Sequence, residues 1–125
     1  MGLCLAAGAL TARLAVAAFT LAWTHSVERV RWEEDWRVEG ASLALVEARV
    51  QGSGAGMEPP EGAVLEGGFW RYRPDLAPLP RLELARGGVV PDWRLCVAGR
   101  CRELAGYLPA EARDAPSVEL HACGG

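Results

Sequence analysis

Residues 30 to 38 read VRWEEDWRV, and apolar and polar side chains alternate along this stretch. A period of two is typical of a β-strand, in which successive side chains point to opposite faces. One face of the predicted strand holds Trp32, Glu34, Trp36 and Val38, and the other holds Arg31, Glu33, Asp35 and Arg37. The two tryptophans would also share a helical face, but the following Glu39-Gly40 and the β-rich surroundings favour a strand.

The same alternation continues along the chain. Residues 43–50 form the next predicted strand, with Glu39-Gly40 as the hairpin turn. Its two faces are expected to hold Ala44, Val46, Ala48 and Val50 on one side and Leu43, Leu45, Glu47 and Arg49 on the other. Further strands are predicted over 3–6, 10–16, 19–27, 63–66, 69–73, 81–86, 93–97, 100–104 and 118–123, with a turn at Ala7-Gly8 and a loop or helical turn over 109–116.

Fifteen glycines and eight prolines separate these strands, which suits many short strands better than a few long helices. The predicted fold class is therefore all-β: a single compact β-sandwich or partly open barrel of short antiparallel strands, spanning residues 1–125 as one domain. All thirteen basic residues are arginines and are outnumbered by sixteen acids, so a nucleic-acid partner is not expected.

The N-terminal segment Leu3–Trp23 is apolar enough to be compared with a secretion signal or a membrane span. A signal peptide carries basic residues before its apolar stretch, but here Arg13 falls inside it. A span needs about twenty uninterrupted apolar residues, and Gly8 and Thr20 are among those that interrupt this one. We therefore expect strands of the core sheet and no transmembrane span, with a cleaved or anchoring segment as the alternative.

The four cysteines predict disulfides. Cys96 and Cys101 flank a short turn and suit a local bridge, and a second bridge between Cys4 and Cys123 near the chain ends is geometrically reasonable. Four cysteines allow three pairings, and free thiols or a structural metal are alternatives. No metal is expected, because no C-x-x-C pair occurs. Disulfides favour an extracytoplasmic, periplasmic location, although no clear signal peptide is present.

Catalytic residues are not expected. His25 and Ser26 are neighbours on a strand, so their side chains point to opposite faces and cannot form a nucleophile and base pair. The glycine-rich loop Gly52–Met57 lacks the Gly-Lys-Ser/Thr ending of a phosphate-binding loop, so no nucleotide or other cofactor is expected. Between positions 28 and 37 the chain carries seven charged residues: Glu28, Arg29, Arg31, Glu33, Glu34, Asp35 and Arg37. We interpret them as a solvated rim, with a paired buried network as the alternative.

Three stretches together carry a family resemblance: Phe19–Glu28, Trp32–Trp36 and Gly52–Met57. With them the chain resembles the bacterial domain-of-unknown-function 1850 family. The resemblance implies a small β-rich protein, often encoded beside permeases of the TRAP type, which carry organic acids and depend on periplasmic receptors. It implies no established activity, and therefore no catalytic residues.

The leading hypothesis is a non-enzymatic accessory or binding protein associated with such a TRAP-type permease. Both family motifs are polar or irregular where a scaffold would prefer apolar alternation, so they are the candidate binding site for a ligand or partner. The candidate residues are His25, Ser26, Glu28, Trp32, Glu34, Gly54, Gly56, Met57 and Glu58. One alternative is a sensor for a small organic-acid ligand that uses an aromatic pocket, since five tryptophans are many for this length. Another is a hydrolase or isomerase that uses His25 and nearby carboxylates.

Overall fold

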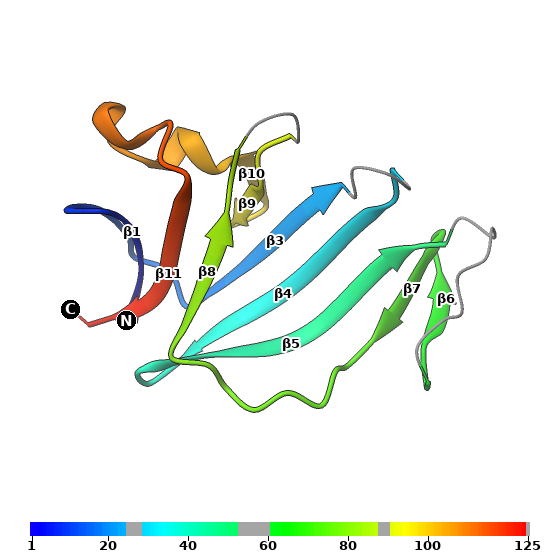
Figure 1. The fold of residues 1–125 in the computed structure, drawn as a ribbon. Coiled ribbons are helices and arrows are strands. Elements are labelled where there is room, and N and C mark those ends of the chain that lie inside the picture. The colour runs from blue at the N-terminus through cyan, green and yellow to red at the C-terminus, as the bar shows by residue number, and fades with distance from the viewer. Residues whose placement is uncertain (25–28, 53–60, 88–90, 125) are drawn as a thin grey trace.

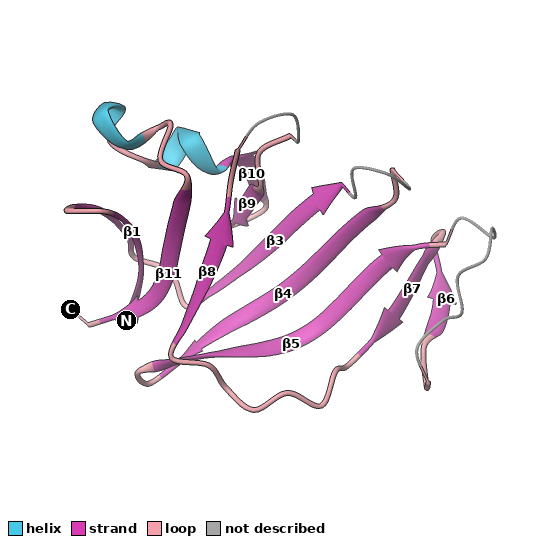
Figure 2. Ribbon diagram, in the orientation of Figure 1, coloured by secondary structure: helices cyan, strands magenta, loops and turns pink. Residues whose placement is uncertain are grey.

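Two antiparallel β-sheets make up the computed structural model, which describes residues 1–24, 29–52, 61–87 and 91–124 (Figures 1 and 2). The four-stranded sheet has the order β2 (Leu10–Leu14), β1 (Gly2–Ala7), β11 (Ser117–Cys123), β8 (Arg81–Ala85). The seven-stranded sheet has the order β10 (Arg100–Glu103), β9 (Arg94–Val97), β3 (Ala18–Thr24), β4 (Arg31–Glu39), β5 (Ser42–Gln51), β7 (Phe69–Tyr72), β6 (Val64–Glu66). The all-β prediction is confirmed, and the two described sheets are compatible with a sandwich and do not close into a barrel.

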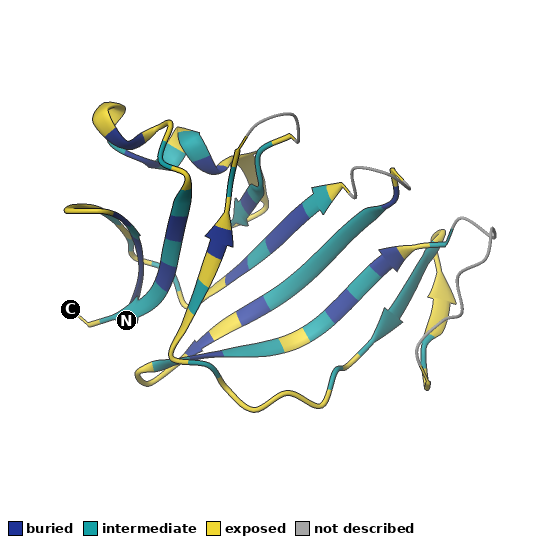
Figure 3. Cartoon of the chain, viewed as in Figure 1, coloured by how far each residue is buried: buried dark blue, intermediate teal, exposed yellow. Residues whose placement is uncertain are grey.

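The core lies between the two sheets. Apolar side chains from both sheets share one cluster, which includes Leu3, Leu5, Val118 and Leu120 from the four-stranded sheet and Phe19, Leu21, Trp36, Val38 and Leu95 from the seven-stranded sheet. Two short 3-10 turns, η1 (Leu104–Tyr107) and η2 (Ala110–Ala112), add the buried Leu104 and Ala112. Buried residues lie on β1, β11 and β8 of one sheet and on β3, β4 and β5 of the other (Figure 3). Each fully buried leucine contributes about 1.5–3 kcal/mol of transfer free energy, so this cluster is the main source of stability.

The two sheets meet at one corner, beside the β4–β5 hairpin. There Leu43 at the start of β5 and Leu79 before β8 exchange two backbone hydrogen bonds, of 2.7 and 2.9 Å. From this corner β8 crosses one end of the seven-stranded sheet, whereas β7 and β6 extend away from it (Figure 1). The four-stranded sheet therefore covers only part of the inner face of the seven-stranded sheet.

A β-bulge corrects the predicted faces of β5. The pairing of β4 with β5 shifts between Asp35, opposite Glu47, and Trp36, opposite Leu45, so Val46 is an extra residue. An extra residue reverses the alternation, because the strand after it continues on the other phase. Leu43 and Leu45 therefore lie on the same inner face as Ala48 and Val50, and the expectation of strict alternation over 43–50 was wrong.

Two hairpin turns lie one residue later than predicted. Ala7 and Glu39 are the last residues of their strands, and the turns are Gly8-Ala9 and Gly40-Ala41. Gly8 has φ +63° and Gly40 has φ +59°. Such angles favour glycine at the first central position of a two-residue turn, so the glycine sets the position of each turn.

The N-terminal segment forms strands, as predicted. It contains β1, β2 and β3, of which β3 is described as far as Thr24. No helix in the described part of the chain has the length and apolar character needed to cross a membrane.

Both predicted disulfides are present. Cys4 of β1 is bonded to Cys123 of β11, and Cys96 of β9 is bonded to Cys101, which lies directly opposite it on β10. All four cysteines are paired in these two bonds, so none is a free thiol.

Candidate binding face

Of the predicted binding residues, the structure describes Trp32 and Glu34, both on β4. The others lie outside the described residues: His25, Ser26, Glu28, Gly54, Gly56, Met57 and Glu58. The described residues that flank the two motifs lie at the same end of the seven-stranded sheet. Arg31, which pairs with Thr24, donates its backbone N–H to Oε1 of Gln51 at 3.1 Å. The end of β3 and the end of β5 are thus joined through β4.

At this end, aromatic side chains form a row across the inner face of the sheet. Trp32 lies opposite Trp23 on β3 and opposite Val50 on β5, and Val50 lies opposite Trp70 on β7. Trp70 in turn lies opposite Leu65 on the edge strand β6. Directly opposed residues on one face have Cβ atoms about 4.5–5.5 Å apart. The row is therefore continuous across five neighbouring strands and reaches the edge of the sheet.

Aromatic contacts strengthen one end of this row. The rings of Trp23 and Trp32 are stacked, with centroids 6.1 Å apart and an interplanar angle of 7°. Trp93 packs on the other side of Trp23, with centroids 4.9 Å apart, and its Nε1 donates to the backbone oxygen of Ala85 on β8 at 2.8 Å. Stacked and tilted aromatic pairs contribute about 0.5–1.5 kcal/mol beyond the area they bury. Trp93 thus anchors the row to the four-stranded sheet.

The other end of the row lies beyond the shared core. Trp23 and Trp93 pack against the core cluster, but Trp32, Val50 and Trp70 are not part of it. Trp32 and Trp70 remain partly exposed, and Leu65 is 56% exposed. We name this surface the aromatic face: Trp23, Trp32, Val50, Trp70 and Leu65, together with Glu34 and Tyr72 on the same side of the sheet.

Glu34 is a carboxylate placed on this mostly apolar face. It lies opposite Leu21 and Ala48, and its Oε1 accepts a hydrogen bond from Nε1 of Trp36 at 3.2 Å. Burial raises the pKa of Glu34 above its ordinary value, and the Trp36 hydrogen bond only partly offsets this effect. Burial, and then the charge of Glu34, raise the pKa of Tyr72. A carboxyl group that holds its proton more tightly than usual can donate as well as accept a hydrogen bond.

Trp32 provides a second polar group. Its Nε1 is buried, and it has no hydrogen-bond partner within the described structure. Buried indole N–H groups are usually satisfied, and an unsatisfied donor costs about 1–3 kcal/mol. The aromatic face therefore carries one donor that an acceptor on a bound molecule would satisfy.

The outer face of the same sheet is chemically different. Arg49 donates to Glu33 at 2.9 Å, to Asp35 at 2.7 Å and to Glu47 at 2.7 Å. Arg71 continues the network from Glu47 to Glu66. A part-buried, paired network thus includes Arg31, Glu33 and Asp35, which corrects the interpretation of these three residues as a solvated rim. Arg37, which pairs with Glu39, is exposed as that interpretation expected.

Ion pairing on the outer face also lowers the pKa of Asp35. The hydrogen bond from Arg49 holds the pKa of Asp35 below its ordinary value, even though burial opposes this effect. A carboxylate that stays ionised and fully bonded is poorly suited to proton transfer at neutral pH. Within the described ranges, no three His, Cys, Asp or Glu side chains are grouped to hold a metal ion. The ion pairs of Arg49 and Arg71 link β4, β5, β7 and β6 across this face.

Sequence reasoning had placed Trp32 and Glu34 together on one face, and the structure confirms that placement. The sequence does not combine Trp70 and Leu65 with them, because their positions depend on the order and register of β5, β7 and β6. The apolar alternation over 64–72 was the available signal, but only strand order shows which strands are neighbours.

Comparison with known proteins gives one result. A family model described as a domain of unknown function, DUF1850, matches residues 19–104. This range contains all the residues of the aromatic face. No curated protein and no solved structure gives a significant match.

Proposed function

Because the chain belongs to the DUF1850 family, which is defined as a domain of unknown function, we propose from its surface chemistry that it is a non-enzymatic binding protein whose aromatic face holds a partner. The observation that carries this proposal is a row of tryptophans that continues past the edge of the shared core. Partly exposed, clustered aromatic side chains are typical of interaction sites, because they bury much area at low entropic cost.

The proposed partner is an apolar segment of a TRAP-type permease. The family resemblance supports the permease, since relatives are often encoded beside such carriers. The composition of the face supports an apolar segment, because its strand residues include no basic side chain, whereas the outer face carries Arg31, Arg49 and Arg71. A face with apolar side chains and one free N–H donor suits a partner with few charges and an available acceptor.

Adjacent residues of β6 offer a matched pair of variants. Leu65 lies opposite Trp70 on the aromatic face, and Val64 lies opposite Arg71 on the outer face. They are 56% and 62% exposed, so replacement of either by serine has little effect on stability. In co-purification with the permease in mild detergent, we expect Leu65→Ser and Trp70→Ala to weaken capture and Val64→Ser to leave it unchanged.

The loss expected for Leu65→Ser is about 1–2 kcal/mol, or roughly five- to thirtyfold in affinity, if the side chain becomes buried in the complex. Equal behaviour of Leu65→Ser and Val64→Ser would show that the aromatic face is not the contact surface. The absence of any association of the wild-type protein with the permease would remove the partner from the proposal.

A small organic acid is a second candidate for the same face, and two groups favour it. The buried Nε1 of Trp32 has no acceptor within the described structure, and Glu34, whose pKa is raised by burial, donates a hydrogen bond when it is protonated. A ligand carboxylate would satisfy both donors. We expect such a ligand to quench or shift tryptophan fluorescence, and to bind more tightly as the pH falls and Glu34 gains its proton. If a panel of dicarboxylates and other organic acids produces no spectral change, this second candidate fails.

A further inference from the structure

The Cys96–Cys101 bridge lies on an exposed edge of the fold. It joins β9 to β10, and β10 is the last strand on its side of the seven-stranded sheet. Cys101 is exposed and Cys96 is partly buried. Access to the bridge is therefore greatest at the sulfur of Cys101.

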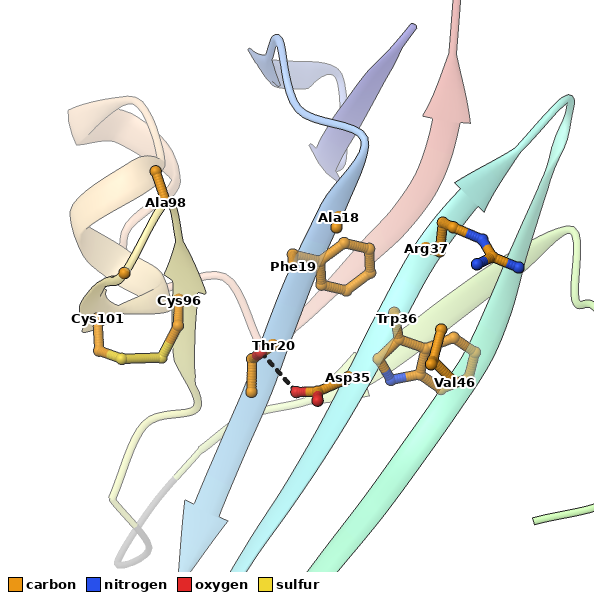
Figure 4. A pocket seen from close by; sticks show the side chains of 11 residues that line it. Ala18, Phe19, Thr20, Asp35, Trp36, Arg37, Val46, Cys96, Ala98 and Cys101 are labelled. Carbon is orange, nitrogen blue, oxygen red and sulfur yellow. Dashed lines mark hydrogen bonds between the residues drawn. A yellow bond between two sulfur atoms is a disulfide. The ribbon is translucent and has the colours of Figure 1, made fainter. Parts of the chain in front are cut away.

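A hollow of about 420 Å³ opens beside this bridge on the outer face (Figure 4). Both half-cystines line it, and Thr20, Asp35 and Arg37 form its opposite side. Asp35 is held there by hydrogen bonds from Thr20 at 2.7 Å and from Arg49. A small molecule or a short peptide loop can thus approach the disulfide without displacing the core.

The second disulfide of the protein has a different environment. Cys123 at the end of β11 is partly exposed, but Cys4 is 7% exposed on β1, which lies between β2 and β11 inside the four-stranded sheet. Its bond to Cys123 ties the two ends of the chain together across 119 positions, whereas Cys96 and Cys101 are separated by 5. Exposed disulfides exchange faster with thiols than buried ones, because the attacking thiolate must reach a sulfur atom.

From these contrasts we propose that the Cys96–Cys101 bridge is a redox site that exchanges with a dithiol reductant, while Cys4–Cys123 remains a structural bond. The first thiolate of the dithiol attacks Sγ of Cys101. The Cys96–Cys101 bond breaks, and Cys96 leaves as a thiolate that takes up a proton. The second thiol of the reductant, as a thiolate, then attacks the reductant sulfur of the mixed disulfide. It releases the Cys101 thiolate, which is protonated in turn, and the reductant departs as its own disulfide, so that two electrons have passed to the protein.

Arg94 assists the leaving thiolate. It lies two positions before Cys96, on the same side of β9, and its Nη2 donates to the backbone oxygen of Cys101 at 3.1 Å. A guanidinium next to the bridge stabilises the thiolate of Cys96, and a better stabilised thiolate leaves faster.

The reduced hairpin keeps its place through other bonds. The backbone N–H of Leu104 donates to the oxygen of Trp93 at 2.8 Å, and the hydroxyl of Tyr107 donates to the oxygen of Leu95 at 2.9 Å. The first contact closes the open end of the β9–β10 hairpin and the second joins β9 to η1, while the strand pairing keeps Cys101 opposite Cys96. The two thiols therefore stay close enough to form the bridge again.

Differential labelling of the full-length protein tests the proposal. The folded protein is treated with dithiothreitol for increasing times, the free thiols are alkylated, and the modified peptides are identified by mass spectrometry. We expect Cys96 and Cys101 to be labelled at least about tenfold faster than Cys4 and Cys123. Equal rates, earlier opening of Cys4–Cys123, or labelling of Cys96 and Cys101 only in urea that unfolds the chain would overturn it.

Two further measurements test the roles of individual residues. With glutathione as the reductant, the trapped adduct is expected on Cys101, and an adduct mainly on Cys96 would contradict the assigned point of attack. Arg94→Gln should slow reduction severalfold, whereas Arg100→Gln, on the same hairpin, should not. Equal slowing by both variants would show that Arg94 has no specific role.

Discussion

The two disulfides should stabilise the fold to very different extents, because they close loops of very different length. A cross-link lowers the entropy of the unfolded chain, and the effect grows with the logarithm of the number of residues enclosed. The Cys4–Cys123 bond spans 119 positions and the Cys96–Cys101 bond spans 5. With these lengths the chain-entropy relation gives about 5 kcal/mol for the first and about 2 kcal/mol for the second.

Each bridge is removed in a separate variant, in which both of its cysteines are replaced by alanine. We expect Cys4→Ala/Cys123→Ala to lower the free energy of unfolding by about 5 kcal/mol and Cys96→Ala/Cys101→Ala to lower it by about 2 kcal/mol. The two double variants are matched, since each loses two sulfur atoms and one bond. Alanine is used because Cys4 is buried, and a serine hydroxyl there would add an unrelated desolvation cost.

Urea unfolding followed by circular dichroism gives both free energies from the midpoint and the slope of the transition. A domain of this size is typically stable by about 5–15 kcal/mol. A Cys4→Ala/Cys123→Ala protein that is already unfolded without urea would thus also agree with the prediction. Equal losses for the two double variants, or a larger loss from the hairpin bridge, would refute the loop-length reasoning.

Three other predictions concern the seven-stranded sheet. Burial raises the pKa of Glu34 above the unfolded value of 4.5, so ionisation of Glu34 opposes folding above that pH. Glu34→Gln should therefore raise the urea midpoint at pH 7. This gain in midpoint should disappear as the pH falls below 4.5. The pKa of Asp35 is lowered by Arg49, so this ion pair stabilises the fold above pH 3.8 and its contribution is lost in acid. Arg49→Met should lower the free energy of unfolding by about 1–2 kcal/mol at pH 7, after allowance for solvent screening, and by less at pH 3. Deletion of Val46 removes the extra residue and joins Leu45 directly to Glu47, so Leu45 and Ala48 keep the inner face in a regular alternation. Both this deletion and Val46→Ala should therefore change the free energy of unfolding by less than about 1 kcal/mol. A larger loss for the deletion, or an unchanged midpoint for either charge variant at pH 7, would contradict the corresponding argument.

Strand positions could be predicted from the sequence because each strand depends on its own alternation and on nearby turn residues. The strand predicted over 30–38, which the structure shows as Arg31–Glu39, and its two faces followed from VRWEEDWRV alone. The β5 faces could not be predicted in the same way. A bulge depends on the pairing of two strands, and Val46 looks like an ordinary member of an alternating run.

Within the candidate site, the sequence could predict which residues of one strand share a face, but not which strands lie next to one another. Trp32 and Glu34 are two positions apart on one strand, so their shared face followed from the period of two. Trp70 joins them only because β7 pairs with β5 in a particular register, which places Trp70 opposite Val50. The order of strands in a sheet is set by long-range packing, and no short stretch of sequence records it.

The position of Glu34 argues that the aromatic face is more than uncovered core. If this end of the sheet served packing alone, an apolar residue between Trp32 and Trp36 would avoid the cost of burying a carboxyl group next to Leu21 and Ala48. The chain instead has a glutamate whose described hydrogen bond comes from the indole of Trp36. It also leaves the indole N–H of Trp32 without a described acceptor, two positions before Glu34 on the same face. Departures from an otherwise consistent apolar pattern are expected where function opposes stability. If Glu34→Gln stabilises the fold and also weakens binding at the aromatic face, then the residue is kept for recognition at a measurable cost in stability.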